Sequence, residues 1–150
     1  MSNIEIGSKI NDFTLRNQNG DDISLSDYRG KKVLLSFHPL AWTSVCTDQM
    51  RALERNYDKF EENNVVVLGL SVDPEPSKKA WASVLSLEKL NILSDFKPLA
   101  KVAKDLDIYN EKLNASERAN FLIDEDGNLI WKKVYELSTL PDLDEIFEII

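Results

Sequence analysis

One cysteine and one histidine lie in the same short segment and could carry nucleophilic chemistry. The chain has a single cysteine, Cys46, and a single histidine, His38. A thiolate is a strong nucleophile, and a nearby imidazole can serve as its base. One cysteine cannot close an intramolecular disulfide, and the two residues together cannot supply the four ligands of a Cys/His zinc site. The pair therefore indicates thiol chemistry, and we expect neither a metal nor a cofactor.

The residues after Cys46 have the periodicity of an amphipathic helix. The apolar positions are Met50, Leu53, Tyr57 and Phe60. This register predicts that Cys46 lies in the first turn, with Thr43 or Ser44 as the N-cap. Unpaired backbone N–H groups and the helix dipole favour a thiolate at that place. We therefore interpret Cys46 as a nucleophile, and the alternative is a small buried residue without chemistry.

Two other thiol chemistries can be weighed from the same segment. With His38 as base, Cys46 would be the nucleophile of a cysteine-histidine hydrolase, although a lone histidine more often satisfies local hydrogen bonds. A thioredoxin-type disulfide exchanger needs a second thiol close to the first. The chain has no second cysteine, so this activity is excluded for the isolated chain.

The surrounding pattern predicts an α/β fold. Nearly continuous apolar runs at 33–37 and 65–70 are typical of strands buried on both faces, and the helix between them completes a βαβ unit. Further elements are expected as follows: a hairpin over 12–15 and 23–25, a helix opened by Pro74 and Pro76, a strand at 91–93, a helix at 98–106, a hairpin of 120–123 and 129–131, and an acidic helix at 140–150. These elements predict a mixed central sheet with helices on both faces and an N-terminal hairpin extension. Open sheets of this kind place their chemistry beyond the carboxyl ends of strands, which is where the segment 37–50 lies.

Length and charge limit the number of domains and the classes of partner. The 150 residues fit a single domain spanning 1–150. The 26 acidic residues against 18 basic ones give a net charge of −8, and the pairs Lys31-Lys32 and Lys78-Lys79 are too short to form a basic patch, so a nucleic-acid partner is disfavoured. No stretch has the roughly 18 apolar residues that a membrane span needs, and no signal peptide is recognisable. We expect a cytoplasmic protein without a membrane partner.

Two separated motifs resemble those of the peroxiredoxins, cysteine-dependent peroxidases with a thioredoxin fold. Pro39, Thr43 and Cys46 fill the family pattern P-x-x-x-T-x-x-C, and the segment 118–124 matches R-x-x-F-x-I-D. Weaker similarities extend over most of the chain. The segment 39–43 is similar to that of short one-cysteine members related to alkyl hydroperoxide reductases. The resemblance implies a thioredoxin fold and a peroxidase reducing hydrogen peroxide or organic hydroperoxides.

The resemblance also implies a role for four residues. Cys46 would be the thiolate that attacks the peroxide and becomes a sulfenic acid. Arg118 would hold that thiolate and hydrogen-bond the peroxide, and Thr43 would offer its hydroxyl to thiolate and substrate. Pro39 would shape and partly dry the pocket.

A solitary cysteine implies a one-Cys cycle. The sulfenic acid would be reduced by an external thiol, either a thioredoxin-like or glutaredoxin-like protein or a low-molecular-weight thiol. The resemblance is compatible with a homodimer. In many relatives an acidic residue stands three positions after the reactive cysteine, whereas here it is Gln49, which leaves the role of that position open. The alternative function is a thioredoxin-like redox sensor or adaptor, in which oxidation of Cys46 switches a partner interaction.

Overall fold

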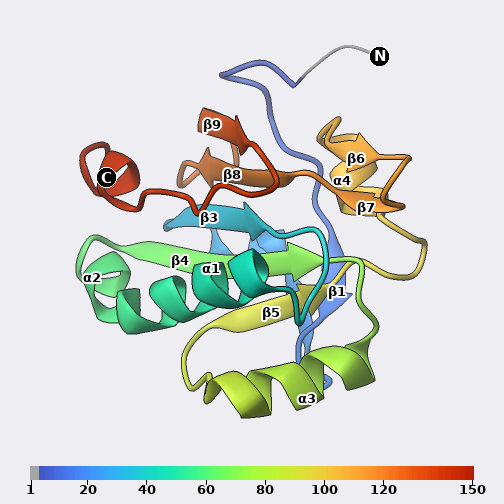
Figure 1. Cartoon of the computed structure of the whole chain (residues 1–150). Coiled ribbons are helices and arrows are strands. Elements are labelled where there is room, and N and C mark those ends of the chain that lie inside the picture. The colour runs from blue at the N-terminus through green and yellow to red at the C-terminus, as the bar shows by residue number, and fades with distance from the viewer. Residues whose placement is uncertain (1–3) are drawn as a thin grey trace.

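A five-stranded mixed sheet forms the centre of the molecule (Figure 1). The computed structural model describes residues 4–150. The strands of the sheet are β3 (Lys32–Phe37), β4 (Val65–Ser71), β5 (Asn91–Ser94), β8 (Arg118–Ile123) and β9 (Leu129–Tyr135). Their order is β5-β4-β3-β8-β9, with β3, β4 and β5 parallel and β8 antiparallel to both β3 and β9. The predicted mixed sheet is confirmed.

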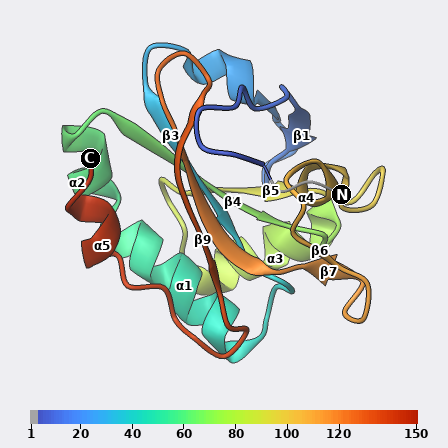
Figure 2. The same ribbon diagram turned by 90° about the horizontal axis from the view of Figure 1, so that it is seen from above.

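Helices cover both faces of this sheet because alternate residues of each central strand point to opposite sides (Figure 2). The helices are α1 (Ser44–Arg55), α2 (Tyr57–Glu62), α3 (Glu75–Leu85), α4 (Lys101–Asp105), α5 (Asp144–Phe147) and the short 3₁₀ helix η1 (Leu25–Tyr28). Leu34 packs in one buried cluster, together with residues of α1, α2, α3 and α5. Val33 and Leu35 pack in the other, together with residues of α4 and η1. Among residues 4–150, none of these helices is long and apolar enough to cross a membrane.

Two small hairpins extend the sheet architecture. The N-terminal hairpin pairs β1 (Thr14–Arg16) with β2 (Asp22–Ser24), as the sequence predicted. Its turn is closed by Asn17 Oδ1, which accepts the N–H groups of Asn19 and Asp21, and by Gly20 in the left-handed region (φ 81°). The second hairpin, β6 (Tyr109–Asn110) with β7 (Ala115–Ser116), was not predicted. Its two-residue strands are too short to show a periodicity.

The single long helix expected after Cys46 is in fact two helices. The side chain of Asn56 donates through Nδ2 to the carbonyl of Ala52 (2.8 Å), and Asn56 itself leaves the helical region at φ −102° and ψ 9°. An asparagine that bonds to the backbone in this way competes with the helical hydrogen-bond ladder. The helical register nevertheless continues, because Tyr57 and Phe60 of α2 are buried on the same face.

Two other helices are shorter than predicted. The helix expected at 98–106 starts only at Lys101, since Ala100 adopts a left-handed conformation (φ 56°). The helix expected at 140–150 is limited to Asp144–Phe147. Pro141 disfavours a helical conformation for Leu140, and the Oδ1 of Asp142 accepts the N–H of Asp144 (3.0 Å) at the start of the helix.

Candidate active site

Cys46 lies in the first turn of α1, at the carboxyl end of β3. The helix begins at Ser44, and the N-cap is Thr43 with extended dihedral angles (φ −75°, ψ 156°). The first helical hydrogen bond runs from the N–H of Thr47 to the carbonyl of Thr43 (2.9 Å). The predicted position of Cys46 is therefore confirmed, and its side chain is fully buried.

The guanidinium of Arg118 contacts the thiol. Arg118 is the first residue of β8, and because β8 runs antiparallel to β3, its start lies beside the end of β3. Its Nη1 lies 3.4 Å from Cys46 Sγ. Nε and Nη2 both donate to the carbonyl of Leu137 (3.1 and 2.8 Å), which fixes the plane of the guanidinium. The side chain is 3% exposed, and its guanidinium places a positive charge against the sulfur.

The side chain of Gln49 also binds the guanidinium of Arg118. It lies one turn after Cys46, and its Oε1 accepts a hydrogen bond from Arg118 Nη1 (2.7 Å). Its Nε2 donates to Ser36 Oγ (2.8 Å) and to the Phe37 carbonyl (3.1 Å). The orientation of the amide is determined by its partners, because a guanidinium only donates and a carbonyl only accepts. A neutral amide thus orients Arg118 without neutralising it. The sequence alone left this role open.

Pro39 and Thr43 complete the set of predicted site residues. Pro39 is buried at the entry of the loop that precedes α1, whereas Thr43 is exposed. The hydroxyl of Thr43 donates to the carbonyl of Leu40 (2.9 Å) and not to Cys46. Its oxygen therefore keeps lone pairs that can accept a hydrogen bond from a ligand.

Two side-chain contacts tie the loop before α1 to the start of α3. The N–H of Ala41 donates to Asp73 Oδ2 (2.7 Å), and Trp42 Nε1 donates to Ser77 Oγ (3.2 Å). Trp42 has a positive φ of 75° and is 49% exposed. The indole therefore lies at the surface beside the loop, where it can report on changes at the site.

His38 does not form a nucleophile–base pair with Cys46. Its ring is fully buried, and Nε2 lies 3.4 Å from Lys78 Nζ. Burial, together with the positive charges of Lys78 and Arg118, holds the pKa of His38 well below its usual range. The neutral ring packs against Trp81 with centroids 5.3 Å apart. This arrangement gives no support to a cysteine-histidine hydrolase.

Lys78 is a buried charged group that the sequence analysis missed. The pair Lys78-Lys79 was interpreted only as a short basic pair, yet Lys79 is exposed and Lys78 is fully buried. Burial lowers the pKa of Lys78 from 10.5 to about 7, against the opposing effect of nearby negative charges. The helical spacing of Lys78 with Trp81 and Leu85, which are also buried, could have indicated that Lys78 lies on the buried face of the helix.

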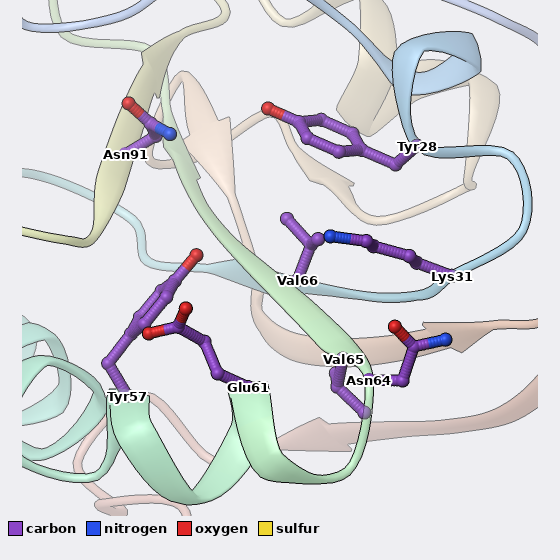
Figure 3. A pocket seen from close by; sticks show the side chains of 8 residues that line it. All are labelled: Tyr28, Lys31, Tyr57, Glu61, Asn64, Val65, Val66 and Asn91. Carbon is purple, nitrogen blue, oxygen red and sulfur yellow. The ribbon is translucent and has the colours of Figure 1, made fainter.

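A hollow at the opposite end of the sheet contains none of the predicted site residues (Figure 3). Its volume is about 240 Å³. It is lined by Tyr28, Lys31, Tyr57, Glu61, Asn64, Val65, Val66 and Asn91. The lining residues include Val65 and Val66 at the start of β4, whereas Cys46 follows the end of β3.

Comparison with known sequences gives one family over most of the chain. The model of the AhpC/TSA family matches residues 6–132. Alkyl hydroperoxide reductase E of Mycobacterium tuberculosis is 36% identical over 125 residues, covering 83% of this chain and 81% of that protein. Peroxiredoxin Bcp of Bacillus subtilis is 32% identical over 157 residues, covering 95% of this chain and 98% of that protein.

Solved structures agree in fold. The reduced 2-Cys peroxiredoxin of Plasmodium vivax superposes with a TM-score of 0.88 at 30% identity, covering 96% of this chain and 79% of that one. The AhpC of Enterococcus faecalis gives a TM-score of 0.89 at 22% identity, with coverages of 98% and 90%, and at that identity the likeness concerns the fold alone. The thioredoxin fold expected from the motifs is confirmed.

Proposed function

The chain belongs to the AhpC/TSA family, and from that premise we propose that Cys46, Arg118, Thr43 and Pro39 form its peroxide-reducing site. The chain is a thiol peroxidase of the one-Cys type, because its sequence holds a single cysteine. The observation that supports the site most directly is the 3.4 Å contact between Arg118 Nη1 and Cys46 Sγ. It joins residues 72 positions apart, which belong to the two motifs recognised in the sequence.

The chemical step is a displacement at oxygen. The thiolate of Cys46 attacks the terminal oxygen of the peroxide, an S–O bond forms as the O–O bond breaks, and the sulfur is oxidised to a sulfenic acid. The other oxygen leaves with the electron pair of the broken bond and takes a proton from solvent. Arg118 stabilises the thiolate before the attack and the negative charge that develops on the leaving oxygen. Thr43, whose own hydrogen is committed to Leu40, accepts the peroxide hydroxyl.

Gln49 contributes by positioning Arg118. Its side-chain oxygen takes one of the N–H groups of Nη1 and leaves the other directed at the sulfur. Since the amide carries no charge, the full positive charge of the guanidinium remains available to Cys46. The position that is acidic in many relatives therefore keeps a hydrogen-bonding role here without a carboxylate.

Reduction of the sulfenic acid requires a thiol from another molecule. That thiol attacks the oxidised sulfur, water leaves, and a second thiol then cleaves the mixed disulfide. Because Cys46 is fully buried, a protein reductant reaches its sulfur only after a local rearrangement of the site. A thiol-rich compartment such as the cytoplasm supplies reductants of this kind, and we place the protein there as part of the proposal.

Steady-state turnover tests this function. Purified protein is supplied with hydrogen peroxide or an organic hydroperoxide and with thioredoxin, glutaredoxin or glutathione as reductant, and peroxide loss is followed. We expect continuous consumption with at least one reductant and none in Cys46→Ser. A burst limited to one peroxide per chain with every reductant would contradict turnover and favour the redox sensor.

A further inference from the structure

A lysine lies buried behind the candidate active site without a direct counter-ion. Lys78, in the first turn of α3, is 0% exposed. Its Nζ lies 3.4 Å from His38 Nε2. Among residues 4–150, the ion pairs are all made by other side chains. Enclosing an ammonium without a carboxylate partner is costly, and the fold therefore gives up stability to keep this group.

The Nζ of Lys78 contacts His38 directly, and charged groups from three further segments act on it electrostatically. His38 follows β3, and the three further groups are Cys46 in α1, Asp73 between β4 and α3, and Asp95 after β5. The negative charges of Asp73, Cys46 and Asp95 all favour the protonated amine, in that order, while burial disfavours it. The positive charge of Arg118 acts on the same His38 ring. Lys78 is thus part of one electrostatic cluster with the reactive cysteine.

The two carboxylates of this cluster are already engaged elsewhere. Asp73 accepts the N–H of Ala41 (2.7 Å) and the hydroxyl of Ser71 (2.5 Å). Asp95 accepts two backbone N–H groups of α4 at 3.1 Å each. Both carboxylates therefore have hydrogen-bond partners of their own, and neither forms an ion pair with Lys78 among residues 4–150.

His38 gives the ammonium a fixed acceptor. Burial holds the pKa of His38 well below its usual range, so the ring is neutral at working pH. A neutral imidazole that accepts from an ammonium at Nε2 carries its hydrogen on Nδ1, which is buried without a hydrogen-bond partner among residues 4–150. Because Trp81 packs against the ring, its position is constrained, and the ammonium held on it is constrained too.

We propose that Lys78 is a positioning residue of the peroxidase site, a second buried cation that acts through space on the thiolate of Cys46. This inference rests on the proposed role of Cys46 as the peroxide-reactive nucleophile. No bond forms or breaks at Lys78. Its charge, added to that of Arg118, stabilises the thiolate before the attack and the anionic oxygen that leaves during it.

The test is the pH dependence of a rate ratio. The second-order rate constant for oxidation of Cys46 by hydrogen peroxide is measured in the wild type and in Lys78→Met by stopped-flow fluorescence. Their ratio contains both the difference in Cys46 ionisation that Lys78 causes and its effect on the leaving oxygen. We expect the wild type to be about tenfold faster near pH 6, where the amine is charged, and the ratio to approach one near pH 9. Lys79→Met, an exposed neighbour, is the matched control and should give a ratio near one at every pH.

Further variants keep the test decisive. Lys78→Arg should be oxidised about as fast as the wild type near pH 6. Its rate relative to that of Lys78→Met should not change with pH, because arginine stays charged. If methionine prevents folding, Lys78→Gln keeps a donor to His38 without the charge and replaces it in the test. A wild-type to Lys78→Met rate ratio that stays near 1, or that does not change with pH, would overturn the role of Lys78. The proposed function would be unaffected if the wild type is still oxidised rapidly at Cys46. Slow oxidation in the wild type itself would instead overturn the proposed function.

Discussion

The two ends of the central sheet differ in what they enclose. At the carboxyl end of β3, the side chains of Arg118, Lys78 and Cys46 are all buried, and Arg118 contacts the thiol. At the other end lies an open hollow of about 240 Å³ with Lys31 exposed at its edge (Figure 3). A lysine next to water keeps its charge at little cost, whereas a lysine removed from water does not.

The proposed site is therefore distinguished by buried charge beside a thiol, and the hollow at the other end is lined in part by exposed polar groups. A peroxide is a small substrate, so its site depends on hydrogen-bond donors and charges shielded from water more than on a large cavity. The hollow has polar walls that solvent can screen. Substitutions made separately at each end of the sheet test this difference.

The largest effect is expected at Arg118. Replacing it in Arg118→Ala should slow oxidation of Cys46 by about 10²- to 10³-fold, because the variant loses a charge-assisted donor at the sulfur and at the leaving oxygen. Stopped-flow fluorescence gives the rate, and circular dichroism at increasing temperature gives the stability. If the rate falls only in proportion to the unfolded fraction, Arg118 is a structural residue and the assignment fails.

A smaller effect is expected at Gln49. Gln49→Ala removes the acceptor that orients Arg118, and we expect oxidation to slow by about tenfold, with a loss of about 1–3 kcal/mol in unfolding free energy from the broken buried hydrogen bonds. Ser36→Ala is the control, because it removes one partner of Gln49 without touching the guanidinium. Equal rates in Gln49→Ala and the wild type would show that Arg118 needs no such support.

The stability of Lys78→Met tests the cost of the buried ammonium. Since the pKa of Lys78 is lowered from 10.5 to about 7, the folded wild type releases a proton between these values while the unfolded chain keeps it. Wild-type stability should therefore rise with pH across this window, and the penalty of the buried charge is fully present below about pH 7. Urea unfolding should show Lys78→Met to be more stable by about 2–4 kcal/mol near pH 6, with the gap closing towards pH 10. A gap that does not change with pH would contradict a charged Lys78.

The smallest effect is expected at the hollow. Lys31→Met removes the exposed cation at the other end of the sheet, and we expect the oxidation rate to change less than twofold and the stability by less than about 0.5 kcal/mol. The same stopped-flow and urea measurements apply. A large loss of rate in this variant would show that the two ends of the sheet are coupled and that the comparison is wrong.

The sequence predicted those parts of the site that depend on residue type and spacing. Cys46 was placed in the first turn of a helix by the apolar period, and Arg118 was identified by its motif. Their contact could not be derived from the period, because it depends on strand order across the sheet.

Two of the missed features, Lys78 and Gln49, depend on side-chain partners outside their own segments, whereas the others arise from local effects on the backbone. Lys78 has helical spacing on a buried face, but its residue type argued for the surface. Gln49 is polar on the buried side of α1 and acquires its role only from Arg118. Asn56 divides a helix whose apolar pattern is continuous, because its side chain bonds to the backbone. Likewise, the apolar pattern at 140–150 includes Pro141, which disfavours a helical conformation for the residue before it.

The most direct test of the account is the rate at which Cys46 reacts with hydrogen peroxide. Reduced protein is mixed with one equivalent of peroxide, tryptophan fluorescence is followed by stopped flow, and free cysteine is measured at the same pH. If the burial of Cys46 against Arg118 activates the thiol, the protein should react at least about 10²-fold faster than free cysteine and give a sulfenic acid at Cys46. A rate no higher than that of free cysteine would contradict the account.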